Sequence, residues 1–189
     1  MNKELLVAVL FLIVGTGLFA QSEIQKYHFV GGMFYGSGYY SMTNSYTDAT
    51  GFTSCLGGRL SFFAGSKFLI GGRGNSVTLR YNEPSYYRIG SGGLAASYVL
   101  NKDPLLIFIG VFGGGGRIRN IHAISKQGDY YLTDISSDSF FFVAPEITVS
   151  YRLTDKIGLT FIADYYLTNK SKIKINQGLN VCGGLVFFR

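Results

Sequence analysis

Four charged residues lie within stretches of alternating polarity, where an ionised side chain is costly unless it is paired. They are Arg59, Arg73, Glu146 and Asp164. The arginines lie on either side of the short polar segment 66–67, and the acids lie on either side of segment 154–156. If each segment is the turn of a hairpin, each pair faces across neighbouring strands. Because an arginine can form two hydrogen bonds with one carboxylate, the four side chains can join in one ionic cluster.

A hydrolytic site is the second chemistry that the sequence allows. His122 lies shortly before Ser125, and the acids nearby are Asp129 and Asp134. A serine, a histidine and an acid are the groups of a lipid hydrolase, but serine and aspartate are also common in surface loops. The other histidine, His28, is distant, and no acidic cluster has ligand spacing, so no metal site and no cofactor are expected.

Cationic side chains in the expected loops and strand ends form a third candidate set. They are Arg117, Arg119, His122, Lys126, Lys170, Lys172 and Lys174. Such a set can bind lipid phosphate, an extracellular ligand or another polyanion, and it is equally typical of a plain solvated rim. The net charge is +6, but the cations are scattered rather than grouped, so nucleic acid is not an expected partner.

The N-terminal segment predicts export. In residues 1–20, Lys3 precedes a continuous run of apolar and small residues that ends at Ala20, which is the pattern of a secretory signal peptide. The run is short for the alternative, a transmembrane anchor of about 20 residues. Cleavage after Ala20 would leave residues 21–189 as one domain.

The strands that position the ionic cluster are clearest in residues 139–168. Apolar side chains occupy every second position from 141 to 153 and again from 157 to 167, and mostly small or polar side chains fill the positions between. Successive side chains of a strand point to opposite faces, so this segment predicts an antiparallel hairpin with one apolar face. Each arm has about a dozen residues, close to the roughly 9–11 that a strand needs to cross a bilayer.

The same pattern recurs along the chain and predicts eight long strands. Their expected bounds are residues 26–40, 51–65, 68–82, 86–100, 105–119, 139–153, 157–168 and 177–188. Short polar turns mostly alternate with longer loops between them, an asymmetry that is typical of transmembrane barrels. We therefore predict an all-β fold, an eight-stranded antiparallel up-and-down transmembrane β-barrel.

Alternation alone does not say which face is outside, since a soluble lipocalin-like barrel also alternates. Three features favour lipid outside: long strands, a polar face of mostly Ser, Thr, Gly and Ala, and aromatic residues near the expected rims. The expected rim residues are Phe62, Phe68, Tyr98, Tyr151 and Phe187 near the short turns, and Tyr39, Tyr81, Tyr87, Phe141 and Tyr165 near the loops.

Glycine and cysteine are informative in different ways. The sequence has 26 glycines, and pairs of them recur within the predicted strands, where they permit curvature. Residues 72–76 are expected to contain a bulge. The glycines match no nucleotide-binding fingerprint.

Cys55 and Cys182 fall on inward faces of the second and eighth strands, which the first strand separates by about 9–10 Å. A disulfide spans at most about 7 Å between α-carbons, so free thiols are expected.

Residues 120–138 form the longest predicted connection. Residues 121–125 and 130–135 could extend the fifth and sixth strands as a hairpin that offers an edge to a partner strand. The alternative is a disordered surface loop.

The segments YVLNKDPLLIFIG, YRLTDKIGLTF and GLVFF, with the signal and the eight long strands, resemble small outer-membrane barrels of the OmpA, OmpX and OmpW type. The resemblance covers nearly all of residues 21–189 and is one of architecture rather than of a signature motif. It implies a barrel in the cell outer membrane, in contact with its lipid, with a polar interior filled by side chains. Members act as adhesins, structural barrels, narrow channels or lipid-modifying enzymes, so the fold does not settle function.

Within such a barrel the two charged hairpins lie across from each other. At roughly 2.5 Å of height per tilted residue, both pairs lie about 18–20 Å above the short turns. The cluster would then either close the lumen or only fill the core. We expect a structural or adhesin-like surface protein rather than an enzyme. The alternatives are a narrow channel for small solutes and a loop-borne lipid hydrolase.

Overall fold

The computed structural model describes residues 28–43, 48–82, 84–127, 130–169 and 173–189. The predicted signal in residues 1–20 lies outside these described residues, as do Lys170 and Lys172 of the predicted cationic set.

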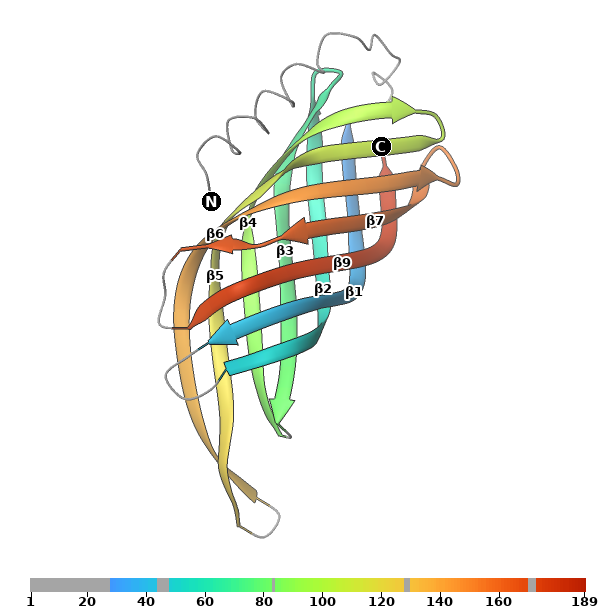
Figure 1. The fold of residues 1–189 in the computed structure, drawn as a ribbon. Helices are drawn as coiled ribbons and strands as arrows, with labels where there is room; N and C mark the ends of the chain where they lie inside the picture. Colours follow the sequence, from blue (N-terminus) through green and yellow to red (C-terminus); the bar gives the residue numbers. More distant parts are fainter. Residues whose placement is uncertain (1–27, 44–47, 83, 128–129, 170–172) are drawn as a thin grey trace.

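The described chain forms one closed antiparallel sheet (Figure 1). Its strands are β1 (Phe29–Thr43), β2 (Asp48–Ala64), β3 (Phe68–Asn82), β4 (Ser85–Lys102), β5 (Leu105–Gln127), β6 (Tyr130–Arg152), β7 (Ile157–Tyr165), β8 (Leu167–Thr168) and β9 (Lys174–Phe188). Strands that follow each other in sequence are neighbours, and β1 pairs with β9 to close the ring. Since β7 and β8 are two parts of one strand interrupted at Tyr166, the ring has eight strands, which confirms the predicted fold class.

The strand bounds agree with the sequence prediction in the middle of the chain and differ at the loop ends. The third strand has the predicted bounds, whereas β5 and β6 continue far beyond residues 119 and 139. They pair as far as Gln127 and Tyr130, so the hairpin was the correct alternative to a disordered loop. In Figure 1 this hairpin extends well past the other strands.

The predicted bulge within residues 72–76 is absent from the described pairing. The β2–β3 and β3–β4 registers run through Arg73 and Asn75 without a shift, and the irregularity of β3 lies between Arg80 and Asn82. The glycines of this segment therefore do not interrupt the ladder.

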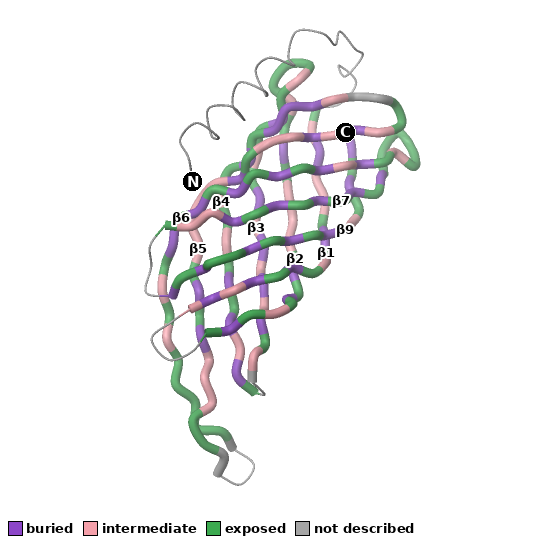
Figure 2. The backbone as a smooth tube through the Cα atoms, viewed as in Figure 1, coloured by how far each residue is buried: buried purple, intermediate pink, exposed green. Residues whose placement is uncertain are grey.

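The outer wall of the barrel is apolar. Along most strands buried and exposed residues alternate, as Figure 2 shows, and large apolar side chains occupy the exposed positions. Phe52, Leu94 and Phe141 are more than 70% exposed, which would be very unfavourable in water and is expected against lipid. Among the described residues, no helix is long and apolar enough to span a membrane.

The lumen is less polar than the sequence pattern predicted. An apolar cluster that includes Phe34, Phe112 and Phe142 fills its loop side, and a smaller cluster around Phe108 and Phe188 fills the end with the short turns. Tyr87, which the prediction placed in the outer aromatic girdle, is fully buried inside. In β1, β5 and the start of β6, apolar residues fall on both faces, so the pattern could not separate the two sides.

Several lumen-facing glycines allow neighbouring backbones to approach closely. Gly184 of β9 lies between the buried residues Cys182 and Val186, and a β-carbon on it would overlap the main-chain carbonyl of Met33 in β1. Gly92 of β4 faces outward, and the nearest atom to a β-carbon there would be the Arg73 carbonyl oxygen at 3.8 Å.

This contrast predicts different responses to the same substitution. Gly184→Ala should lower the free energy of unfolding by about 1–3 kcal/mol because the β1–β9 seam must shift. The matched control Gly92→Ala should change it by less than about 1 kcal/mol. Urea unfolding of the barrel in lipid vesicles measures the free energy of unfolding of both variants, and the mobility shift on unboiled gels reports the folded fraction. Equal responses of the two variants would contradict the close approach at Gly184.

Candidate functional site

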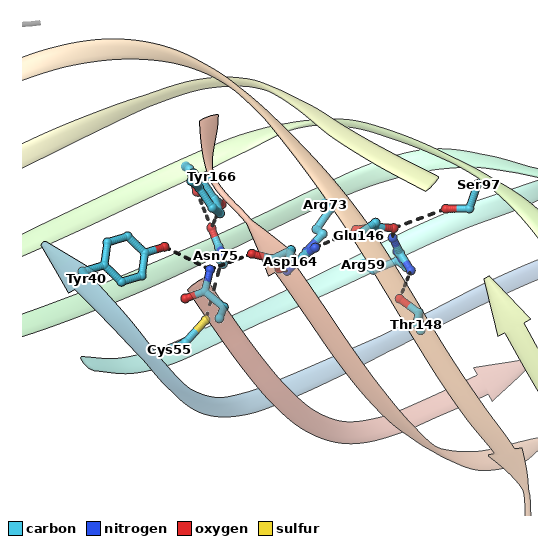
Figure 3. A network of polar contacts seen from close by, with 12 residues as sticks. Tyr40, Cys55, Arg59, Arg73, Asn75, Ser97, Glu146, Thr148, Asp164 and Tyr166 are labelled. Atoms are coloured by element: carbon cyan, nitrogen blue, oxygen red, sulfur yellow. Dashed lines mark hydrogen bonds and ion pairs between the residues drawn. The ribbon is translucent and has the colours of Figure 1, made fainter. Parts of the chain in front are cut away.

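The four predicted charged residues meet in the middle of the lumen (Figure 3). Arg59 on β2 is directly opposite Arg73 on β3, and Glu146 on β6 is directly opposite Asp164 on β7. Each pair is set by the short turn of its hairpin, because the turn fixes the register of the strands. Closure of the ring brings the two hairpins together across the lumen.

The ion pairs link the arginines and acids in a chain. Arg59 Nη2 donates to Glu146 Oε1, and Arg73 Nη1 donates to Glu146 Oε2 at 2.6 Å. Arg73 Nη2 donates to Asp164 Oδ2. The side chains of Arg73, Glu146 and Asp164 are completely buried, and that of Arg59 is 7% exposed. Two positive and two negative charges therefore neutralise one another without water between them.

Aromatic rings hold Arg73 in place from two sides. The carbon at the centre of its guanidinium lies 5.0 Å from the centroid of the Phe34 ring and 4.9 Å from that of the Phe112 ring. Both distances are within the range of a cation–π interaction, which is strongest where water is excluded. The rings thus fix the plane in which Arg73 meets its two acids.

Neutral side chains complete the shell around the acids. Ser97 Oγ donates to Glu146 Oε1 at 3.2 Å, and Asn180 Nδ2 donates to Asp164 Oδ1 at 2.7 Å. Arg59 Nη1 donates to Thr148 Oγ1 at 3.3 Å, and Asn180 Nδ2 also reaches the Tyr40 hydroxyl at 3.0 Å. These contacts come from strands all around the ring, so the network depends on closure.

A second polar group lies beside the cluster and was not predicted. The Tyr166 hydroxyl donates to Asn75 Oδ1 at 2.9 Å and is 2.8 Å from Ser91 Oγ, which also contacts Asn75. Tyr166 lies between β7 and β8, and its buried side chain is on the same inner face as Ile162 and Asp164. The sequence signals were an asparagine in mid-strand at position 75 and the place of Tyr166 on the mostly polar face of the predicted hairpin.

Little open space remains next to the ionic cluster. A cavity of about 20 Å³ lies on the short-turn side of Arg59, lined by residues that include Phe34, Phe108, Thr148 and Ile162. A cavity of this size holds about one water molecule. Apolar side chains lie above and below, so the lumen at this level is packed rather than open.

Cys55 and Cys182 are free and buried on the inner face. Both pair with Gly36 of β1, one from each side, which is the arrangement that the strand order predicted. Asn75 Nδ2 lies 4.0 Å from the Cys55 sulfur.

Within the described residues, the groups of the predicted hydrolase do not form a hydrogen-bonded triad. Asp134 is directly opposite His122 across the β5–β6 ladder, but no serine of the described chain forms a hydrogen bond with His122. The ring of His122 stacks on that of Tyr81, with Nδ1 3.4 Å from the hydroxyl. The described residues also contain no group of histidine, cysteine or acidic side chains able to hold a metal ion.

The cations of the predicted set are distributed over different parts of the surface. Arg117 and Arg119 are exposed on the outer face of β5, and Lys174 is exposed on β9, on the far side of the ring. Lys126 is on β5 near the tip of the long hairpin.

The ionic cluster predicts a rescue between distant strands. Glu146→Gln with Asp164→Asn should lower the free energy of unfolding by about 3–5 kcal/mol, because two buried guanidiniums lose their counter-charges. Adding Arg59→Gln and Arg73→Gln should restore part of this loss. Urea unfolding in lipid vesicles measures both, with Asp155→Asn in the exposed turn as a control for the loss of negative charge. An acid variant as stable as the parent, or a four-site variant without recovery, would contradict the cluster.

No protein-family model and no curated protein sequence matches this chain. Solved structures do match. Neisserial surface protein A has a TM-score of 0.62 and 14% identity, and the match covers 84% of this chain and 96% of that chain. Two further structures are more distant. The N-terminal β-barrel domain of Pseudomonas aeruginosa OprF has a TM-score of 0.49 and 11% identity, and the match covers 86% of this chain and 98% of that chain. Ail, the attachment invasion locus protein of Yersinia pestis, has a TM-score of 0.48 and 11% identity, and the match covers 85% of this chain and 99% of that chain. Identities this low show the fold alone. The chain thus has the fold of a small eight-stranded outer-membrane β-barrel, as the resemblance to the OmpA, OmpX and OmpW type implied.

Proposed function

We propose that the protein is a closed, non-conducting barrel that anchors the β5–β6 hairpin at the cell surface as an adhesin-like contact element. The proposal rests on two features that occur together: the lumen is packed, and one hairpin reaches beyond every neighbouring strand. The barrel then serves as the support, and the hairpin as the part that meets a partner.

The packed lumen argues against the runner-up, a narrow channel. A permeating solute would have to pass the ion pairs of Arg73, which are held between two aromatic rings, and then the apolar clusters on both sides. Separating fully buried charges that lack replacement partners costs several kcal/mol for each ion. The cluster is therefore a closure of the lumen, in addition to a part of its core.

The long hairpin has the features of a binding edge. The last pair between β4 and β5 joins Tyr86 to Ile121, so within the described residues the β4–β5 backbone ladder ends before His122. One further contact is the Ala123 amide, which donates to Ser85 Oγ at 3.0 Å. Ile124, Leu132 and Ile135 are about 60% exposed on this extension. An unpaired edge with apolar side chains can receive an extended segment of another protein by strand addition.

A closed lumen predicts the absence of channel activity. The purified monomer, checked for folding by its mobility on unboiled gels, should give no steady single-channel currents in a planar lipid bilayer. Eight strands leave an interior that side chains just fill, and here these include buried ion pairs. Large and stable currents from the monomer would contradict the proposal.

The hairpin can be tested separately from the barrel. Bacteria that display the full chain should adhere to cultured epithelial monolayers more than cells without it. Replacing residues 123–133 by a two-residue Asn-Gly turn, which keeps the paired residues His122 and Asp134 as its flanks, should return adhesion to background. The hairpin is then closed by a favourable turn, but the protruding strand edge is lost.

The matched control is Ile124→Ser with Leu132→Ser and Ile135→Ser, which removes the exposed apolar side chains but keeps the strand edge. It distinguishes binding through these side chains from binding through the backbone edge. Surface amounts must be equal in all cells. Full adhesion by the shortened variant would rule out the hairpin as the contact element.

A further inference from the structure

Four arginines gather on the outer face of three neighbouring strands, at the level of the loop ends of β3 and β4. Arg80 is on β3, Arg88 is on β4, and Arg117 and Arg119 are on β5. All four are exposed, and each is adjacent in sequence to an inward-facing residue such as Leu79, Ile89 or Ile118. They therefore point away from the lumen, towards the surroundings of the barrel.

These arginines have no counter-charge within the described chain. None of the four takes part in an ion pair, and the contact recorded for Arg117 is a donation from Nη2 to Ser137 Oγ at 3.3 Å. Arg88 and Arg119 are directly opposite each other across the β4–β5 ladder. Like charges at facing positions destabilise a sheet unless an anion lies between them. A hollow of about 250 Å³, lined by Arg88, Gly90, Arg117 and Arg119, is open at this place.

The height of the arginines matches the boundary of the bilayer. At roughly 2.5 Å per tilted residue, Arg80 and Arg117 lie about 30 Å from the short-turn ends of β3 and β5. The apolar band of such barrels is about 25 Å tall, and an arginine on the lipid face is tolerated mainly near its edge. The arginines are thus at the level of lipid headgroups rather than of the acyl chains.

Below the arginines of β4 and β5, the outward positions of the wall are glycines. Gly58, Gly74, Gly92 and Gly115 are paired in one continuous row across β2 to β5. The large side chains of Met33 and Phe141, which are 68% and 73% exposed, bound this row at its two ends. The result is a bare strip on the lipid-facing wall.

The barrel itself does not require glycine in this strip. Added β-carbons at Gly74, Gly92 and Gly115 would find their nearest atoms at 3.5, 3.8 and 3.8 Å, which is ordinary contact distance. Lumen-facing glycines such as Gly93 and Gly114, in contrast, have no such room. The strip therefore lets something outside the barrel approach the backbone closely.

We propose that the outer wall of β3, β4 and β5 binds a phosphorylated lipid of the outer leaflet. Phosphate groups of the lipid are held by Arg88, Arg117 and Arg119, with Arg80 at the margin, and the upper parts of its acyl chains lie on the glycine strip. Guanidinium groups bind phosphate through paired hydrogen bonds, and cations near the membrane surface attract anionic lipid.

The charge of the patch selects this occupant over a second copy of the chain. A two-fold contact through the same wall would place four arginines against four arginines, which is electrostatically unfavourable. A lipid supplies both the missing anion and the flat apolar surface. This site is separate from the hairpin, so its test does not depend on the proposed function.

The test uses the purified full chain in detergent micelles, with lipid adducts measured by native mass spectrometry. The probes are bisphosphorylated lipid A, the same lipid with both phosphates removed, phosphatidylethanolamine and inorganic pyrophosphate. Lipid A should bind at least about tenfold more tightly than its dephosphorylated form, and Arg88→Gln with Arg119→Gln should remove that advantage. Lys174→Gln, which removes an exposed cation on the far side of the ring, is the control and should leave it unchanged.

A second pair of variants examines the strip. Gly92→Leu with Gly115→Leu should weaken lipid A binding, whereas Ala163→Leu, at an exposed position of β7, should not. Unboiled gels confirm that each variant is folded. Unchanged binding in the double arginine variant, equal binding of phosphatidylethanolamine, or pyrophosphate binding as tight as that of lipid A would overturn the proposal.

Discussion

The neutralisation of Arg59 and Arg73 by Glu146 and Asp164 is the interaction on which the lumen depends. Each hairpin taken alone places two like charges at facing positions, which is unfavourable in any sheet. Only the opposite side of a closed ring supplies the counter-charges. The register of two turns, the number of strands and the pairing of four side chains are therefore mutually dependent.

The cluster also organises the packing around it. The aromatic rings of Phe34 and Phe112 enclose Arg73, and the apolar residues of the loop side continue from these rings. On the short-turn side, the smaller apolar cluster around Phe108 and Phe188 fills the lumen. The lumen is thus layered, apolar at both ends and ionic in the middle, which is why we regard the barrel as a support for surface contacts rather than as a path for solutes.

The sequence carries enough information for the strands whose two faces differ. The alternation in residues 139–168 and the short turn within it are sufficient to predict that Glu146 lies opposite Asp164, and the β6–β7 register confirms this. The lumen is less polar than predicted because Phe140 and Phe142 are buried in it while Phe141 is exposed, so apolar residues occupy both faces there. The contacts of Asn75 with Tyr166 join positions far apart in the chain, and no local pattern reports such a contact.

The sequence separation within the ionic cluster has a consequence for the order of assembly. Arg73 and its two acids are 73 and 91 residues apart, and Arg59 is 87 residues from Glu146. None of these contacts can form within a single hairpin, so a partly closed sheet carries its like-charged pairs without compensation. Ring closure and charge pairing must therefore occur together, late on the folding path, and a barrel that has closed in the wrong register is distinguished from the native one by its unpaired charges.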